Sequence, residues 1–354
     1  MMKRPRSILV ALFLFALWAF ACVPEFSDDL ALVTQPRILA VRAEPAEARA
    51  GQRVTLTALV AAPPGASSAS ERLEWAMCLA RKPLTELGPV AHECIDRFGA
   101  GGEIFQRLGR GPSVSATIPS DACNRFGPLT PPATAGGVAG RPVDPDLSGG
   151  YHQPLVLGNE TGTALGSVRL TCGVIGVPST EAARYGQGYR PNENPEIDRL
   201  EITSGSVRTI EPGTERPGAN VPAGARVDLR VVWAACPRAP ACGDGLCTSG
   251  ENQSTCAADC RDAPRGCTGA ETYLWANPDT RKVEERREGV TVSWFASAGS
   301  FAEEQTGRSE RDVDVSHGSN VWTAPSAPAT VHVWVVLRDD RGGVGFREYL
   351  LRVD

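Results

Sequence analysis

The sequence predicts an all-β protein in which two copies of one β domain follow each other. Glycine (37) and proline (28) are abundant among the 354 residues, which favours many turns between short strands. Short runs alternate between apolar and polar residues, as in 53–60, where Val54, Leu56, Ala58 and Val60 share one face. This period of two is typical of a strand with one buried side. Helical spacing of apolar residues is never sustained beyond two turns.

The first domain is expected over residues 36–178. Its predicted strands, in order, are 38–42, 53–60, 73–78, 113–118, 153–157 and 167–174. The third of these carries a central Trp75. Residues 128–150 are rich in proline, glycine and alanine and predict a long irregular loop.

The second domain, 195–354, repeats the pattern of the first. Residues 195–202 echo 36–43, residues 223–232 echo 50–59, and Trp294 within 290–295 stands where Trp75 stood. A repeat of this length indicates tandem copies. Residues 179–194 are the predicted linker; Tyr185 and Tyr189 within it form an aromatic stretch that is either a connection or a recognition loop.

This order of strands resembles the immunoglobulin-like β-sandwich of bacterial surface proteins, which has short alternating strands and a buried strand tryptophan. The segments 321–325, 330–337, 339–343 and 349–353 resemble the end of a polycystic-kidney-disease or cadherin-like domain, where a D-x-x-G turn joins two strands. The residues themselves agree: Val331, Val333 and Val335 alternate with His332 and Trp334, and 339–343 suits a hairpin turn. The fold class is therefore all-β, with two tandem immunoglobulin-like β-sandwiches and a small disulfide-rich insertion in the second.

Residues 1–21 predict a signal peptide, because basic residues precede a short apolar run and small residues. Cys22 then resembles the lipobox cysteine of bacterial lipoproteins, which takes a diacylglyceryl group. Ala19 stands where leucine is usual and Phe20 is bulky, and Ala19–Ala21 also satisfies the rule of ordinary signal peptidase, so a soluble secreted protein is the alternative. Residues 22–35 would be the tether. By the best-known sorting rule, Val23 favours the outer membrane, with the protein facing the periplasm or the surface.

The cysteine count indicates an oxidising compartment. Setting aside Cys22, 11 − 1 = 10 cysteines remain, enough for five disulfides. We expect Cys78–Cys94 and Cys123–Cys172, with Cys78–Cys172 as the alternative.

Residues 242–260 resemble the C-G-D-G-x-C disulfide module of secreted, especially myxobacterial, proteins. Cys242, Cys247, Cys256 and Cys260 belong to the module, and Cys236 and Cys267 flank it and would close its base. An insertion over 236–267 in a loop of the second domain is expected. Four of its polar residues suit either calcium or turns that accept backbone N–H groups, and we favour turns: Asp244, Glu251, Asn252 and Asp259. We expect no metal and no cofactor.

The charge and motifs argue against nucleic-acid binding and catalysis. The mature chain carries about −5 − 3 = −8 charges, which disfavours binding to phosphates. None of the four histidines lies in a metal-binding or catalytic motif. The leading hypothesis is a lipid-anchored, non-catalytic envelope protein for binding, adhesion or structure, whose partners are the membrane and an envelope protein or polysaccharide. A carbohydrate-binding module that positions an enzyme is the alternative, and a hydrolase is less favoured.

The aromatic residues divide into core and candidate binding positions. Trp75, Trp294 and Trp322 are expected in the cores. Trp334 lies on the strand face opposite the valines and is expected to be exposed. Trp334, Tyr185 and Tyr189 are therefore the candidate binding residues.

Overall fold

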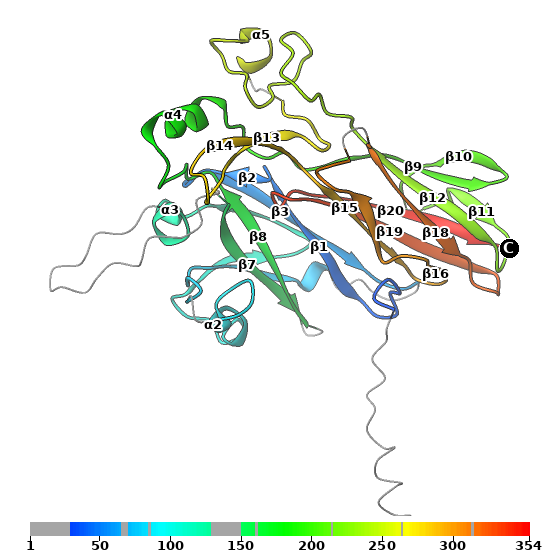
Figure 1. The fold of residues 1–354 in the computed structure, drawn as a ribbon. Coiled ribbons are helices and arrows are strands. Elements are labelled where there is room, and N and C mark those ends of the chain that lie inside the picture. Colours follow the sequence, from blue (N-terminus) through cyan, green and yellow to red (C-terminus); the bar gives the residue numbers. More distant parts are fainter. Residues whose placement is uncertain are drawn as a thin grey trace, which may run out of the picture. The chain divides into compact units, whose positions relative to one another are not determined.

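The computed structural model describes residues 29–64, 70–83, 86–128, 150–159, 162–213, 215–262, 265–312 and 315–354. The predicted signal peptide, Cys22 and nearly all of the expected 128–150 loop lie outside these residues. Residues Ala31–Asp354 form one compact unit (Figure 1). Within the described part of the chain, no helix is long and apolar enough to cross a membrane.

The first sandwich consists of two sheets: a three-stranded sheet in the order β1-β3-β6 and a five-stranded sheet in the order β2-β8-β7-β4-β5. Its strands are β1 (Arg37–Glu44), β2 (Glu47–Ala48), β3 (Arg53–Ala61), β4 (Glu74–Cys78), β5 (Phe105–Arg110), β6 (Ser113–Thr117), β7 (Tyr151–Asn159) and β8 (Gly162–Leu170). Short helices η1 (Ser70–Arg72), α2 (His92–Asp96) and α3 (Ala122–Arg125) lie in its loops.

The second sandwich repeats this plan with the sheets β10-β9-β12-β18-β16 and β11-β20-β19-β15-β17. Its strands are β9 (Ile197–Ser204), β10 (Ser206–Ile210), β11 (Ala219–Val221), β12 (Arg226–Trp233), β15 (Val290–Ala296), β16 (Ser300–Phe301), β17 (Gln305–Arg308), β18 (His317–Thr323), β19 (Ala329–Asp339) and β20 (Val344–Val353). In both sandwiches a short strand pairs in parallel with the last strand: β2 with β8, and β11 with β20. The predicted all-β fold of two tandem sandwiches is confirmed.

Tryptophans fill both cores, as expected. Trp75 lies in the first core, and Trp294 and Trp322 lie in the second; all three are fully buried. The predicted alternation in 53–60 also holds, because Val54, Leu56 and Ala58 face the first core. Each aromatic ring removes a large apolar area from water, which is the main stabilising contribution of such cores.

A separate apolar cluster joins the two sandwiches. Leu39 and Leu59, from β1 and β3, pack with Trp334 and Val336 of β19 and with Val344 of β20. The three-stranded sheet of the first sandwich thus covers the outer face of the sheet that contains β19.

The chain is already ordered before the predicted start of the fold. The Val33 amide donates to the Ala296 carbonyl at 2.8 Å, and the Ala296 amide donates to the Ala31 carbonyl at 2.9 Å. Val33 is fully buried in the cluster between the sandwiches. The expected tether 22–35 is therefore too long at its carboxyl end, since residues 31–33 bind the end of β15.

The cysteine-rich segment is inserted between β12 and β15, as predicted. It carries α5 (Ala257–Cys260), and a hairpin of β13 (Thr272–Ala276) and β14 (Val283–Arg287) follows it. Cys236–Cys267 closes its base, and Cys242–Cys256 and Cys247–Cys260 lie inside it. Cys78–Cys94 and Cys123–Cys172 are confirmed, and the alternative Cys78–Cys172 is wrong.

The predicted linker is a fixed element. Its first ten residues form helix α4 (Ser179–Gly188), which packs on the β13–β14 hairpin. Glu181 accepts the Val283 amide at 2.8 Å, and Arg184 donates to the Val283 carbonyl at 2.6 Å. Both main-chain groups of Val283 are thus used to hold the helix.

Candidate functional site

Trp334 is buried, not exposed. The strand alternation is as predicted, because Val331, Val333 and Val335 face the second core and Trp334 points the other way. The first sandwich covers that other face, and Trp334 is only 1% exposed. His332 stacks on its ring at 5.6 Å. The expected accessibility of Trp334 is therefore wrong.

Tyr185 and Tyr189 are also buried, at 4% and 8% exposure. Their rings stack at 4.5 Å and pack on Leu274 and Val283 of the hairpin. The Tyr189 hydroxyl donates to Glu47 Oε2 at 2.6 Å. Of the two expected roles, the rings serve as a connection and are not exposed for recognition, because they hold α4 between the hairpin and the first sandwich.

Trp275 is the partly exposed tryptophan of the described residues. The Arg286 guanidinium lies 3.4 Å from its ring centroid, so a cation already covers the ring. The other described tryptophans are buried: Trp75, Trp233, Trp294, Trp322 and Trp334. Among the described residues no coplanar set of tryptophans faces solvent, which removes the support expected for a carbohydrate platform.

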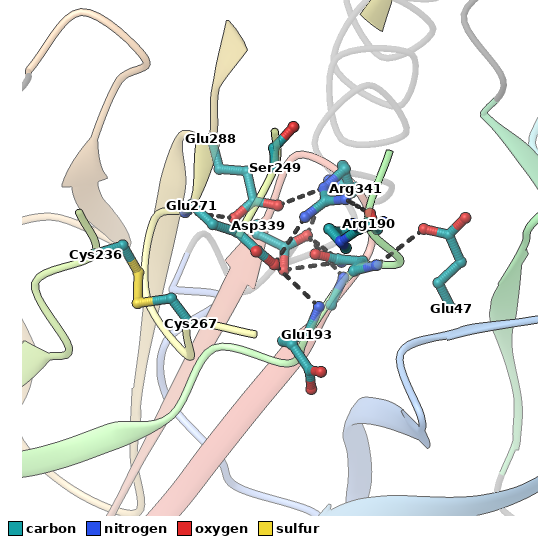
Figure 2. Close-up of polar contacts among 12 residues, drawn as sticks. Glu47, Arg190, Glu193, Cys236, Ser249, Cys267, Glu271, Glu288, Asp339 and Arg341 are labelled. Atoms are coloured by element: carbon teal, nitrogen blue, oxygen red, sulfur yellow. Dashed lines mark hydrogen bonds and ion pairs between the residues drawn. A yellow bond between two sulfur atoms is a disulfide. The ribbon is translucent and has the colours of Figure 1, made fainter. Parts of the chain in front are cut away.

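The most elaborate polar arrangement lies where the two sandwiches, the α4 segment and the hairpin meet (Figure 2). Its centre is Arg341, in the turn between β19 and β20, which is 2% exposed. Arg341 Nε donates to Glu288 at 2.6 Å, and its Nη2 donates to Glu271 at 2.8 Å. Its Nη1 donates to the Arg190 carbonyl at 3.0 Å. One guanidinium thereby binds three segments of the chain.

Two asparagines extend this network to the first sandwich. The Asn192 side chain donates to Asp339, and the Asn192 amide donates to Glu47 of β2 at 3.0 Å. Glu47 also forms a buried ion pair with Arg169 of β8 at 3.2 Å. Asn194 donates to the Ala43 carbonyl and accepts the Val344 amide. We call Glu47, Arg169, Asn192, Asn194, Glu271, Glu288, Asp339 and Arg341 the junction network.

Carboxylates outnumber cations in the junction network. Glu47, Glu271, Glu288 and Asp339 are buried with only two arginines. Burial raises the pKa of Glu271 to about 7 and raises the pKa values of Glu288 and Asp339, although Arg341 opposes all three shifts. Burial alone would lower the pKa of Arg341, but the charges of Glu288 and Glu271 raise it well above its usual value. Burial therefore favours the protonated form of Glu271 near neutral pH.

An open cleft borders the junction network. It measures about 450 Å³ and is lined by Glu47, Arg49, Thr171, Arg190 and Glu193, among others. Burial raises the pKa of Glu193 above its usual value. Because Glu47 already accepts three hydrogen bonds and pairs with Arg169, this carboxylate is committed to holding the junction together.

No local sequence pattern identifies the junction network. The turn 339–343 was predicted as a hairpin, and the Asp339 carboxylate does accept the Arg341 and Gly343 amides at 2.9 and 2.8 Å. The partners of Arg341 come from loops 53 to 151 residues earlier, so no local pattern marks them. The one available signal was a charged residue at the tip of a turn that otherwise required only glycine and aspartate.

The acids of the cysteine-rich module shape its turns, as we favoured. Asp259 accepts the amides of Gly243 and Gly245 at 2.6 and 3.2 Å. Glu251 accepts the Thr248 amide at 2.9 Å. Cys242, Cys256 and Asp259 lie together in a grouping that resembles a metal site, but the two cysteines are bonded to each other. They therefore offer no thiolate ligand.

Two of the four histidines, His317 and His332, lie in strands β18 and β19. His332 Nδ1 lies 2.7 Å from a Glu348 oxygen. The nearby Ser297 hydroxyl accepts the main-chain amide of His332 at 3.0 Å. His317 Nδ1 lies 3.3 Å from Arg230, and burial with this cation lowers its pKa. These contacts connect neighbouring strands.

Comparisons with known proteins assign this chain to no family. No protein-family model and no curated protein matches it. Dimeric latent PorU from Porphyromonas gingivalis aligns at 12% identity and a TM-score of 0.20, over 91% of this chain and 24% of that one. The adhesin InvE of Yersinia pseudotuberculosis aligns at 8% identity and a TM-score of 0.20, over 88% of this chain and 58% of that one. Trypsin-activated alpha-2-macroglobulin of Escherichia coli aligns at 10% identity and a TM-score of 0.18, over 90% of this chain and 18% of that one. The chain spans less than two thirds of each of these proteins, and the scores carry no functional argument.

Proposed function

We propose that this protein is a lipid-anchored, non-catalytic component of a bacterial cell envelope, in which a rigid pair of sandwiches presents binding surfaces. The observation that carries this proposal is the junction network. A spacer or adhesion module transmits position and force only if its domains keep a fixed relation. Here the buried hydrogen bonds from Asn192 to Glu47 and from Asn194 to the Ala43 carbonyl, together with the apolar cluster around Trp334, connect the domains.

The five disulfides and the sequence of the first 22 residues support the compartment. Disulfides persist in the periplasm and at the cell surface. Here two of them clip loops of the first sandwich and three lie in the inserted module. Cys22 would supply the acyl chains, and a stable hold on a bilayer generally needs more than one chain. The outer membrane is the proposed site.

The test is to purify the protein from membranes of its host and to measure the mass of its N-terminal peptide. A diacylated Cys22 as the first residue supports the proposal, and a Cys22→Ser variant should then move to the soluble fraction. An unmodified N-terminus in a soluble protein would establish the secreted alternative. A Thr34→Ser variant is the matched control and should fractionate like the wild type.

A further inference from the structure

The two sandwiches can be compared residue by residue along their last strands, β8 and β20. Both strands end in the same kind of bond: the Thr171 amide donates to the Ala48 carbonyl at 3.0 Å, and the Asp354 amide donates to the Val221 carbonyl at 3.1 Å. Both strands also pair with their neighbours, β7 and β19, without a register shift. Counting back from the shared bond therefore gives equivalent positions in the two copies.

The equivalent positions differ in what covers them. Ser167 of β8 corresponds to Leu350 of β20. In the second sandwich the chain that follows β10 lies on this edge: the Gly218 amide donates to the Leu350 carbonyl at 2.7 Å, and the Gly213 amide donates to the carbonyl two residues earlier, at 2.9 Å. In the first sandwich β1 passes almost directly into β2. No described residue makes such a bond to Ser167 or Leu165.

The main-chain groups of Leu165 and Ser167 point away from β7. Their direction alternates along a strand, and the Thr171 amide, which has the same direction, bonds β2. Pro154 lies opposite Ser167 and has no amide hydrogen to share with it. Thr163 and Ser167 are exposed, and Leu165 is half-buried. These three residues therefore present amides and carbonyls that the described part of the chain leaves unused.

Two hollows lie between this edge and β1, which runs beside β8 (Figure 1). They measure about 170 and 260 Å³, and Ile38 of β1 and Ala164 of β8 line both of them. Val41 occupies the space that a side chain on Gly166 would need, so the two edges pack there without main-chain pairing. A strand added to β8 would place alternate side chains against Ile38 and Ala164.

The edge of β8, and not that of β1, is the available one. On β1, Arg338 donates to the Leu39 carbonyl at 2.7 Å, and Asn194 donates to the Ala43 carbonyl at 2.7 Å. Native proteins usually protect a free edge with a charged residue, a proline or a bulge. Residues 162–168 contain neither a charge nor a proline, and their pairing with β7 is regular. This edge is therefore uncharged and unprotected.

From these observations we infer that the free edge of β8 takes up an extended, uncharged segment of a partner protein, which pairs with the main chain of residues 163–167 and places small apolar side chains beside Ile38 and Ala164. The inference rests on the proposed binding role, and it names the surface and the kind of partner that the role requires. The second sandwich supplies the precedent, because its own chain covers the equivalent edge. Main-chain bonds would give affinity, and the hollows would select the side chains.

The test uses the full mature chain and a fluorescent peptide in which threonine and valine alternate between terminal lysine pairs that keep it soluble. A control peptide has the same side chains but carries an N-methyl group on every threonine and valine, so it cannot donate main-chain hydrogen bonds. Fluorescence polarisation should show binding of the first peptide and binding at least about tenfold weaker for the second.

Variants of the chain locate the site. Ser167→Pro removes one outward N–H without removing a bond to β7, and it should weaken binding about tenfold, whereas Ser167→Ala keeps that N–H and should bind like the wild type. Ile38→Asp places a charge beside both hollows and should also weaken binding. Val207→Asp, at an exposed apolar residue of β10, is its matched control. Thermal unfolding of each variant separates loss of binding from loss of fold.

Hydrogen exchange measured by NMR reads the edge directly. The amides of Leu165 and Ser167 should exchange fast in the free chain and slowly in the complex, while the Ala164 amide, which points toward β7, should be slow in both. Slow exchange at Leu165 and Ser167 in the free chain would overturn the inference. Equal binding of the N-methylated peptide, or unchanged binding by Ser167→Pro, would do so as well.

Two further outcomes separate this inference from its alternatives. A dimer of the chain that Ser167→Pro dissociates would overturn it, because a second copy would then be the occupant. The peptide assay does not depend on Cys22, so binding by a chain without lipid would retain the docking edge while rejecting the anchor. A lipidated chain that does not bind the peptide would do the reverse.

Discussion

Arg341 Nε lies 2.6 Å from Glu288 Oε1, and the two side chains are 2% and 0% exposed. Such a pair is costly to bury, because both charges lose their water. It persists here because the guanidinium also binds Glu271 and a main-chain carbonyl, while Glu288 accepts the Glu271 amide at 3.0 Å. The pair fixes the turn of the second sandwich against the α4 segment and, through Asn192, against the first sandwich.

Removing the central cation should be severely destabilising. Arg341→Met leaves Glu271 and Glu288 buried without their partner, and we expect a loss of about 3–5 kcal/mol in the free energy of unfolding. Urea unfolding followed by tryptophan fluorescence measures it. Adding Glu271→Gln and Glu288→Gln to this variant should restore part of the lost stability. Arg352→Met, at a surface ion pair, should stay within about 0.5 kcal/mol of the wild type.

Stability should fall as the pH rises from about 5 to 8. Burial raises the pKa of Glu271 from 4.5 to about 7 in the folded state, so the folded chain holds a proton that the unfolded chain has lost. The stabilisation is full below the unfolded pKa and disappears as pH passes through the folded one. Glu271→Gln should remove this pH dependence, which amounts to at most about 3 kcal/mol in the free energy of unfolding. Unfolding at pH 5, 6.5 and 8 checks this, with Glu285→Gln at an exposed site as the control. Parallel profiles for both variants would contradict it.

Removing the Trp334 side chain should destabilise the protein more than removing the Trp275 side chain. Trp334→Ala opens a cavity between the sandwiches, and we expect a loss of about 3–5 kcal/mol and a larger maximum dimension in X-ray scattering. Trp275→Ala removes a partly exposed ring and should cost about 1 kcal/mol or less. Equal losses would mean that the cluster around Trp334 does not join the sandwiches.

The Cys236–Cys267 disulfide should protect the inserted module locally. It closes a loop with a sequence separation of 31, and the module also binds the α4 segment through Ser249 and Gly250, which donate to the Gly188 carbonyl. The double variant Cys236→Ser/Cys267→Ser should lose hydrogen-exchange protection over 236–267, while β19 and β20 keep theirs. A uniform loss across the second sandwich would show instead that the insertion supports the whole core.

Local pattern by itself determined most of the core strands, but not β5, β10 or the β13–β14 hairpin. It also determined the tandem repeat, the place of the insertion and the core role of Trp75, Trp294 and Trp322. These features follow from periods of two and from turn residues, which act over a few positions. Three of the five cysteine pairs were expected from the sequence, Cys78–Cys94, Cys123–Cys172 and Cys236–Cys267, whereas the pairing inside the 242–260 module was not. The face of the strand from which Trp334 projects was also predicted correctly, because strand alternation fixes it.

Only the tertiary structure decided what covers each face. Trp334 is buried because a second sheet packs on it, and nothing in residues 329–339 encodes that sheet. Tyr185 and Tyr189 are buried because the inserted hairpin receives them. Arg341 becomes the centre of the junction because loops up to 151 residues away supply its carboxylate and carbonyl partners. Burial and long-range electrostatics depend on packing between distant segments, and a local sequence pattern carries no record of that packing.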